Sequence, residues 1–264
     1  LCEHLDWLTP AGRPKFEACA KLLARMEEAG ELRLPSLRKD KSHPGPRSCA
    51  LRRASARIDP PESLVRSLSE LDAVRLRLAS DPEEEHLWNE YVERYHPLGY
   101  KKPFGYWARY FIESAEHRLG CILLGGAAKA LTARDQWIGW NDRQRLANLP
   151  WVVNNSRYLI FPWVEVANLA SHVLGQLARR VGDDWEARWG YRPVLLETFV
   201  DPARFRGSCY RAAGWALLGR TTGEGLVRPG KQYRTSPKLI FAKPLQADFR
   251  ALLCSDQLTG TTEL

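Results

Sequence analysis

Residues 193–220 constrain the fold more than any other part of the chain. They begin with the apolar pattern of a buried strand at 193–200 and continue through a short polar loop. A helix then ends at Gly214, and a second strand starts at Trp215. Glycine suits a helix end because it adopts the left-handed conformation at little cost. A strand, a helix and a strand in this order predict a mixed α/β domain.

Other apolar runs extend this pattern along the chain. Buried strands are expected at 119–124, 157–161 and 239–241, and a helix at 168–181. Two helices are expected between residues 62 and 95, the second capped by Asp81 before Pro82. Residues 223–237 are rich in Gly, Arg and Lys, which is typical of a loop.

The first 35 residues predict a small helical unit. Gly12 and Pro14 open a segment with apolar residues at helical spacing, and Gly30 supplies a stop. Residues 31–35 alternate like a short strand. Two helices followed by a strand begin a winged helix, so this unit is either a winged helix or an ordinary helical extension.

Residues 36–61 form a basic, proline-rich linker with almost nothing apolar to bury. The chain as a whole carries a net charge of +8, from 39 Lys and Arg against 31 Asp and Glu, which favours a polyanionic partner. A basic tether would contact phosphates without reading sequence, although it could equally serve solubility. The candidate nucleic-acid contacts are Arg38, Lys39, Lys41, Arg52 and Arg53.

The six cysteines are scattered, without a C-x-x-C pair and without histidines at zinc-ligand spacing. They predict reduced thiols in a cytoplasmic protein, and no metal site is expected. No apolar run is long enough to cross a membrane, and no secretory leader is recognisable. The sequence starts at Leu1, as expected for a fragment or a processed product.

Several spaced motifs make the chain similar to a known family. They include Arg94-Tyr95-His96-Pro97-Leu98-Gly99-Tyr100, a second stretch at 134–140, Asn154-Asn155-Ser156-Arg157, the segments 162–164 and 168–172, and Glu197-Thr198-Phe199-Val200-Asp201. These stretches resemble the Druantia anti-phage system protein A family, a domain of unknown function also found near transposases. The resemblance implies a role in phage defence or mobile elements, with other defence proteins as partners, and names no reaction.

The 193–220 segment also resembles the last part of the GCN5-related N-acetyltransferase fold. Tyr210 lies four residues before the Gly214-Trp215 pair, where the resemblance implies a tyrosine that protonates the departing coenzyme A thiolate. The alternative is an interior tyrosine with a satisfied hydroxyl. Cys209 is a candidate nucleophile with His96 or His172 as its base, or else a small core residue.

Residues 165–170 correspond to the phosphate-binding loop of that fold. The resemblance implies Gln or Arg, then Gly, then Gly or Ala, where this chain has Glu165, Asn168 and Ala170. A carboxylate would repel a diphosphate, and the side chain of Asn168 would crowd its approach. No cofactor is therefore expected, with acetyl-coenzyme A as the alternative.

A set of polar residues predicts a ligand-binding cleft at the centre of the sheet. Amides, arginines and a carboxylate suit hydrogen-bonded recognition of a nucleotide or another small polar ligand. The alternative is a structural polar network that fixes loops. The set comprises Arg134, Asp135, Asn154, Asn155, Arg157, Asn168, Ser171, His172, Glu197 and Thr198.

A metal-dependent nuclease would need several carboxylates that converge on its metal ions. Asp135, Asp142 and Asp201 sit among turn residues, where a carboxylate commonly caps the local backbone. Glu197 lies on an expected strand and is, with Tyr210 and Cys209, a candidate catalytic residue.

The sequence thus predicts three parts: a helical or winged-helix unit at 1–35, the linker at 36–61, and a GCN5-related acetyltransferase-like α/β domain at 62–264. The predicted function is a nucleic-acid-linked component of an anti-phage or mobile-element system that binds a polar ligand or nucleotide. The alternative is an N-acyltransferase that uses acyl-coenzyme A or aminoacyl-tRNA.

Overall fold

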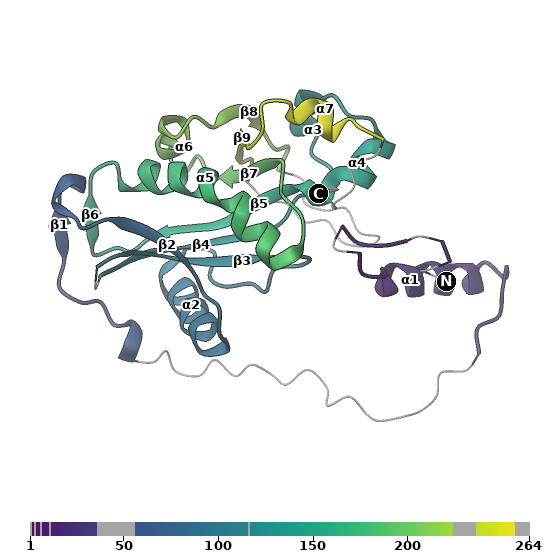
Figure 1. Cartoon of the computed structure of the whole chain (residues 1–264), viewed down its shortest axis with the longest axis horizontal. Helices are drawn as coiled ribbons and strands as arrows, with labels where there is room; N and C mark the ends of the chain where they lie inside the picture. Colours follow the sequence, from purple (N-terminus) through teal and green to yellow (C-terminus); the bar gives the residue numbers. More distant parts are fainter. Residues whose placement is uncertain are drawn as a thin grey trace. The chain divides into compact units, whose positions relative to one another are not determined.

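The computed structural model describes residues 2, 4–5, 7–10, 12–35, 56–115, 117–223 and 236–256 (Figure 1). The chain divides into two compact units. One comprises Leu1–Ala54 with Thr259–Leu264, and the other comprises Ser55–Leu258.

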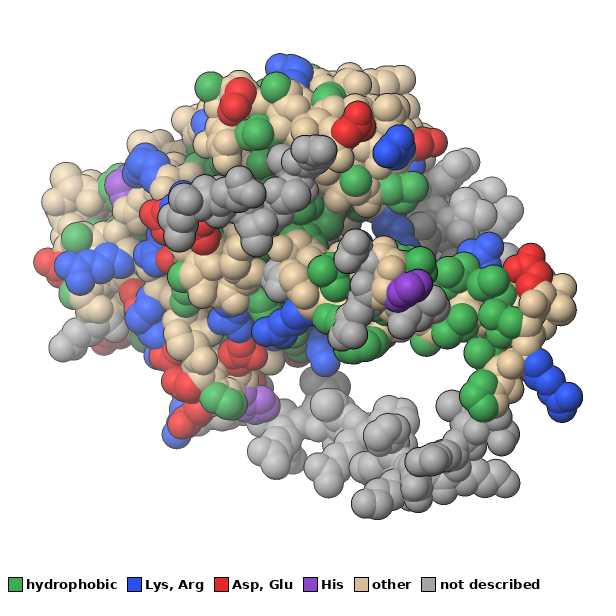
Figure 2. All heavy atoms as spheres, turned by 45° about the vertical axis from the view of Figure 1, so that its right-hand side comes forward, with side chains coloured by type: hydrophobic (Ala, Val, Ile, Leu, Met, Phe, Trp, Pro, Cys, Tyr) green, Lys and Arg blue, Asp and Glu red, His purple; other side chains and the backbone are tan. Residues whose placement is uncertain are grey.

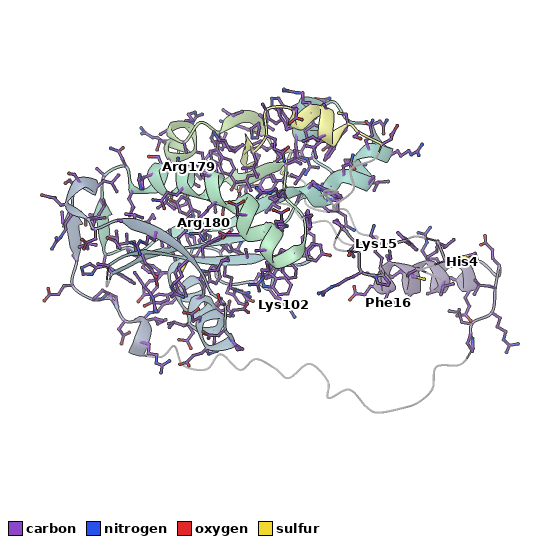
Figure 3. All side chains as sticks on the ribbon, in the orientation of Figure 1. His4, Lys15, Phe16, Lys102, Arg179 and Arg180 are labelled. Carbon is purple, nitrogen blue, oxygen red and sulfur yellow. The ribbon has the colours of Figure 1, made fainter. Side chains whose placement is uncertain are left out.

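The N-terminal unit is built around helix α1 (Phe16–Glu28). Gly30, with φ of 77°, ends the helix, and Cys2 and Cys19 are buried. Figure 2 shows hydrophobic side chains gathered on the visible face of this unit, and Phe16, labelled in Figure 3, is 70% exposed. The prediction of a short strand at 31–35 is wrong, because residues 32–35 adopt no regular structure. A winged helix is not observed in the described part of this unit.

A seven-stranded mixed sheet forms the second unit. Its order is β2-β3-β4-β5-β7-β9-β8. The strands are β2 (Val74–Leu78), β3 (Ala108–Ser114), β4 (His117–Gly126), β5 (Val152–Ile160), β7 (Leu195–Val200), β9 (Leu239–Pro244) and β8 (Ala216–Arg220). Neighbouring strands are antiparallel except β5 and β7, which run parallel. This confirms the predicted mixed α/β class.

Two long helices cover opposite faces of the sheet (Figure 1). Helix α2 (Pro82–Tyr95) begins where the Asp81 side chain accepts from the Glu84 amide, as the sequence predicts, and packs Tyr91 edge-on against Phe111. Helix α5 (Leu169–Trp189) places Arg180, labelled in Figure 3, over the ring of Tyr110. Successive residues of a strand face opposite sides, so Phe111 and Tyr110 receive the two helices separately.

Four short helices complete this unit: α3 (Thr132–Ile138), α4 (Asp142–Asn148), α6 (Ser208–Ala212) and α7 (Phe249–Leu253). Helix α6 lies between β7 and β8 in the chain, which confirms the strand, helix and strand predicted for 193–220. None of the helices that the structure describes combines the length and the apolar character needed to cross a membrane.

The prediction of two helices between residues 62 and 95 is wrong for the first of them. This stretch holds β1 (Leu64–Arg66), a 3-10 turn at Leu68–Glu70, and strand β2. Val74 and Leu76 are buried while Arg75 is exposed, which is the alternation of a strand. The leucines are also spaced by three or four residues, as in a helix. The segment forms a strand because β2 pairs with β3.

Candidate ligand cavity between β5 and β7

The parallel strands β5 and β7 separate at the centre of the sheet. Their pairing runs from Val152 opposite Leu195 to Asn155 opposite Thr198, and β5 then continues to Ile160 paired with β4 but no longer with β7. Ser156 is an extra residue in β5, because Leu124 faces Asn155 whereas Leu123 faces Arg157. A cavity of about 640 Å³ lies where the strands part.

The bulge at Ser156 changes which side chains point into this cavity. An extra residue reverses the alternation of a strand, so Asn155 and Tyr158 fall on the same face. Tyr210 of α6 meets both: its hydroxyl accepts from Asn155 Nδ2 at 3.3 Å, and its ring lies 6.2 Å from that of Tyr158. The Thr198 hydroxyl donates to the Asn155 carbonyl at 2.9 Å. We call Asn155, Thr198 and Tyr210 the polar floor.

The polar floor is buried, and burial raises the pKa of the Tyr210 hydroxyl well above its usual range. Tyr210 is therefore neutral at physiological pH. Asn155 is 3% exposed, and no described residue donates to its Oδ1 atom. This oxygen is itself covered by protein atoms and is not exposed to the cavity.

Positive charge dominates the cavity walls. Among the described residues, four cationic side chains line the cavity, Arg157, Arg204, Arg206 and Lys238, against the single carboxylate of Asp201. Lys238 lies 3.4 Å from Asp201, whereas Arg204 and Arg206 are exposed at the mouth. Across the face seen in Figure 2, by contrast, acidic and basic side chains are interspersed. An anion would be attracted to this cavity.

The segment after α2 supplies another wall. Arg157 donates from Nε to the Gly99 carbonyl at 2.8 Å, which holds residues 96–99 against β5. His96 lines the cavity, and its Nδ1 accepts from the Leu98 amide at 3.2 Å. Burial, with the charge of Arg157 as the smaller cause, lowers the pKa of His96 to about 4. His96 is therefore neutral at pH 7 and carries its proton on Nε2.

Cys209 also lines the cavity, together with its proposed base His96. Burial raises the pKa of the Cys209 thiol, so the group is protonated at neutral pH, which disfavours the nucleophile hypothesis. The other proposed base, His172, does not line the cavity. Its Nε2 lies 2.9 Å from the Gln176 amide nitrogen on the next turn of α5.

Arg134, Asp135 and Glu197 form a separate buried network on α3 and β7. The Arg134 guanidinium donates to Glu197 Oε2 at 2.8 Å and to Asp135 Oδ1 at 2.8 Å. Glu197 Oε1 accepts from the Ala128 amide at 2.8 Å, and Asp135 also accepts from the Trp140 indole. Arg134 and Glu197 are both 0% exposed. These three residues do not line the cavity, which favours a structural network for them.

The remaining predicted ligand residues divide between the cavity and its edge. Asn154 lines the cavity, and its Oδ1 is buried without a partner among the described residues. Asn168 and Ser171 lie at the start of α5, where the Ser171 hydroxyl donates to the Asn168 carbonyl at 3.0 Å. Neither lines the cavity, whereas Ala170 between them does.

The expected phosphate loop at 165–170 is only partly a loop. Val164–Val166 forms strand β6, which pairs in parallel with β1, so Glu165 is an exposed strand residue. Asn168 has φ of 63°, the left-handed conformation that glycine favours and asparagine tolerates. A carboxylate on a paired strand and a side chain at the glycine position do not fit the diphosphate of coenzyme A.

Sequence reasoning missed several residues of the cavity. Arg204, Phe205 and Arg206 belong to what was read only as a polar loop, and Lys238 comes from the approach to β9. The Arg-Phe-Arg pattern of that loop was the available signal. The linker candidates Arg38, Lys39, Lys41, Arg52 and Arg53 lie outside the described residues. Within the described ranges, no group of three or more His, Cys, Asp or Glu is placed to hold a metal ion.

Several solved structures are distantly similar to the chain. An aminoglycoside acetyltransferase AAC(6')-Ib in complex with coenzyme A and kanamycin is 16% identical, with a TM-score of 0.42, covering 67% of this chain and 98% of that one. FeeM, an N-acyl amino acid synthase from uncultured soil microbes, is 14% identical, with a TM-score of 0.38, covering 68% and 93%. A Bacillus subtilis acetyltransferase in complex with CoA is 11% identical, with a TM-score of 0.37, covering 66% and 100%.

These distant likenesses carry no conclusion about what this chain binds. No curated protein matches it. The family model described as Druantia protein DruA matches residues 31–230, which is most of the chain and includes β5, β7 and the polar floor. The chain belongs to the Druantia protein DruA family.

Proposed function

We propose that this protein acts in anti-phage defence, together with other proteins, by binding a phosphorylated ligand of the nucleotide class in the cavity between β5 and β7. The defence context comes from the family. The ligand class is supported by one observation above all: four cationic side chains and one carboxylate surround a cavity with a polar floor.

The size and the other lining residues support the same class. A cavity of about 640 Å³ is in the usual range for small-molecule sites, which is about 300–1,000 Å³. Phe205 at the mouth is 56% exposed and Leu98 is 63% exposed, so apolar surface is available for the face of a base. Arg204 and Arg206 flank Phe205, where phosphate groups would be held by charge-assisted hydrogen bonds.

An N-acyltransferase is the second candidate, because Tyr210 lies at the floor of the cavity. Two features rank it lower. The Tyr210 hydroxyl already accepts a hydrogen bond from Asn155, and burial raises its pKa well above the usual range. The turn before α5 offers Glu165 and Asn168 where a diphosphate would need free amides.

Isothermal titration calorimetry of the full chain with nucleoside mono- and triphosphates tests the proposal. We expect binding that weakens as salt increases. The double variant Arg204→Ala/Arg206→Ala should lower affinity at least tenfold, because two charge-assisted contacts are lost, each worth about 1.5–3 kcal/mol. Arg75→Ala is the matched control, since Arg75 is an exposed arginine of β2 that does not line the cavity.

Acetyl-coenzyme A is titrated in parallel. If acetyl-coenzyme A binds more tightly than every nucleotide and the protein releases free thiol from it, the N-acyltransferase function is the better supported of the two. If nucleotides bind equally well to the double variant and the control, the cavity is not their site. In cells, the double variant should lose protection in a phage challenge while the control keeps it.

A further inference from the structure

The cavity has hydrogen-bond donors on both of its sides. Because it lies where β5 and β7 part, one side is built on β5 and the other follows β7. Arg157 belongs to β5, whereas Arg204 and Arg206 follow β7. His96 joins the β5 side, because Arg157 holds the segment 96–99 against that strand. We call Arg157 and His96 the β5 donor pair, and Arg204 and Arg206 the mouth arginines.

Each member of the β5 donor pair keeps one N–H group for a ligand. Arg157 uses Nε for the Gly99 carbonyl at 2.8 Å and Nη1 for the Ser156 carbonyl at 2.7 Å, and no described residue accepts from its Nη2. His96 accepts from the Leu98 amide through Nδ1, so its proton is on Nε2, which also has no partner among the described residues. Neither Nη2 nor Nε2 is among the buried atoms without a partner, so both are accessible to solvent.

The β5 donor pair suits an oxyanion. Its two free groups are both donors, and the guanidinium adds a full positive charge. Phosphate oxygens accept charge-assisted hydrogen bonds from such groups. Among the described residues, the single carboxylate of the cavity is Asp201, which lies on the β7 side beside Lys238. No described carboxylate on the β5 side of the cavity therefore competes for this pair.

The mouth arginines form a second position for an anion. Both are exposed, and Phe205 between them is 56% exposed. One phosphate group is far smaller than the cavity of about 640 Å³, so a single phosphate cannot satisfy both sides. A ligand that uses the donors on both sides must carry two separated anionic groups.

We infer that the ligand carries two phosphate groups separated by one nucleoside, with one phosphate at the mouth arginines and the other at the β5 donor pair. This inference rests on the proposed function and specifies its ligand. A free nucleoside 3′,5′-bisphosphate presents this chemistry, and so does the 5′-phosphorylated end of a nucleic-acid strand. Nucleoside di- and triphosphates do not, because their phosphates form a single run on one side of the sugar.

Calorimetry of the full chain with CMP, CTP and cytidine 3′,5′-bisphosphate tests the inference on the unmodified protein. CTP carries a total charge similar to that of the bisphosphate, so a difference between the two reports where the phosphates lie. We expect the bisphosphate to bind more tightly than either CMP or CTP, by about tenfold. If CMP binds and the bisphosphate binds no more tightly than CTP, the inference is overturned and the proposed function stands. If no nucleotide binds at all, both fall.

Two substitutions of His96 examine the β5 donor pair. In His96→Asn the amide oxygen still accepts from the Leu98 amide, but no N–H group reaches the place of Nε2. His96→Gln keeps an N–H donor at that reach. We expect His96→Asn to lower the affinity for the bisphosphate by about tenfold with CMP unchanged, and His96→Gln and the control Arg75→Ala to keep most of it. Thermal unfolding confirms that each variant is folded. Full bisphosphate affinity in His96→Asn, or an equal loss for CMP, would refute the second phosphate position.

A 5′-phosphorylated dicytidine distinguishes the two sources of the ligand. Its internal phosphate lies where the bisphosphate carries its 3′-phosphate, and a second nucleoside follows. Binding at least as tight as that of the bisphosphate, with the same loss in His96→Asn, assigns the site to a strand end. Weaker binding than that of the bisphosphate assigns the site to a free nucleotide.

Discussion

Replacing Glu197 with glutamine tests whether the buried network with Arg134 and Asp135 is structural. The Glu197 carboxylate accepts from Arg134 at 2.8 Å and from the Ala128 amide at 2.8 Å, and it is 0% exposed. Glutamine keeps one acceptor for Ala128, but it removes the negative charge and can turn an N–H group toward the guanidinium. Arg134 would then retain Asp135 and the Ala128 carbonyl.

The expected loss of stability follows from that geometry. Breaking a buried ion pair typically costs about 3–5 kcal/mol, and the contacts left to Arg134 place this change near the lower end, at about 3 kcal/mol. For a unit of this size, about 2–4 °C is lost per kcal/mol, so Tm should fall by roughly 6–12 °C. Urea unfolding followed by circular dichroism gives the free energy directly.

The same substitution at an exposed pair supplies the control. Glu83 pairs with Arg57 at 2.6 Å, with side chains 76% and 67% exposed, so Glu83→Gln should cost less than about 1 kcal/mol. If Glu197→Gln is no more destabilising than Glu83→Gln yet abolishes protection against phage, the network is a functional site and the structural account is wrong.

Two further predictions concern pH and the linker. His96, whose pKa is lowered from 6.5 to about 4, stays neutral in the folded protein while the unfolded chain takes up a proton, so stability should fall as pH drops from about 6.5 to 4. His96→Gln should flatten this dependence in urea titrations, whereas the exposed His117→Gln should not. For the linker, the sequence predicts DNA binding that weakens as salt increases. Charge reversal should lower the affinity and flatten its dependence on salt concentration in fluorescence titrations. Unchanged binding would mean that the linker serves only solubility. The reversed residues are Arg38, Lys39, Arg52 and Arg53.

The local sequence pattern was sufficient to predict secondary structure where it fitted only one type of element. Residues 193–220 contain an apolar run, a polar loop and Gly214, and they form β7, α6 and β8. Residues 64–78 were ambiguous, because leucines spaced for a helix also alternate with arginines in β2. Pairing with β3, a partner distant in sequence, decided that case.

The candidate site was predictable in part for the same reason. Asn155, Arg157 and Thr198 all line the cavity, and the strands expected at 157–161 and 193–200 carry the last two of them. The exclusion of Arg134 and Glu197 depends on α3 folding back against β8 and β9, which brings Arg134 to Glu197 and which no local pattern reveals. Arg204 follows β7 and Lys238 precedes β9, and the two residues line the same cavity because these strands are neighbours in the sheet, which their sequence spacing does not indicate.

A structure determined with bound CMP tests the central claim most directly. The account predicts the base between β5 and β7 and the phosphate beside Arg204 and Arg206. A phosphate bound at the start of α5 near Asn168, or a ligand outside this cavity, would contradict it.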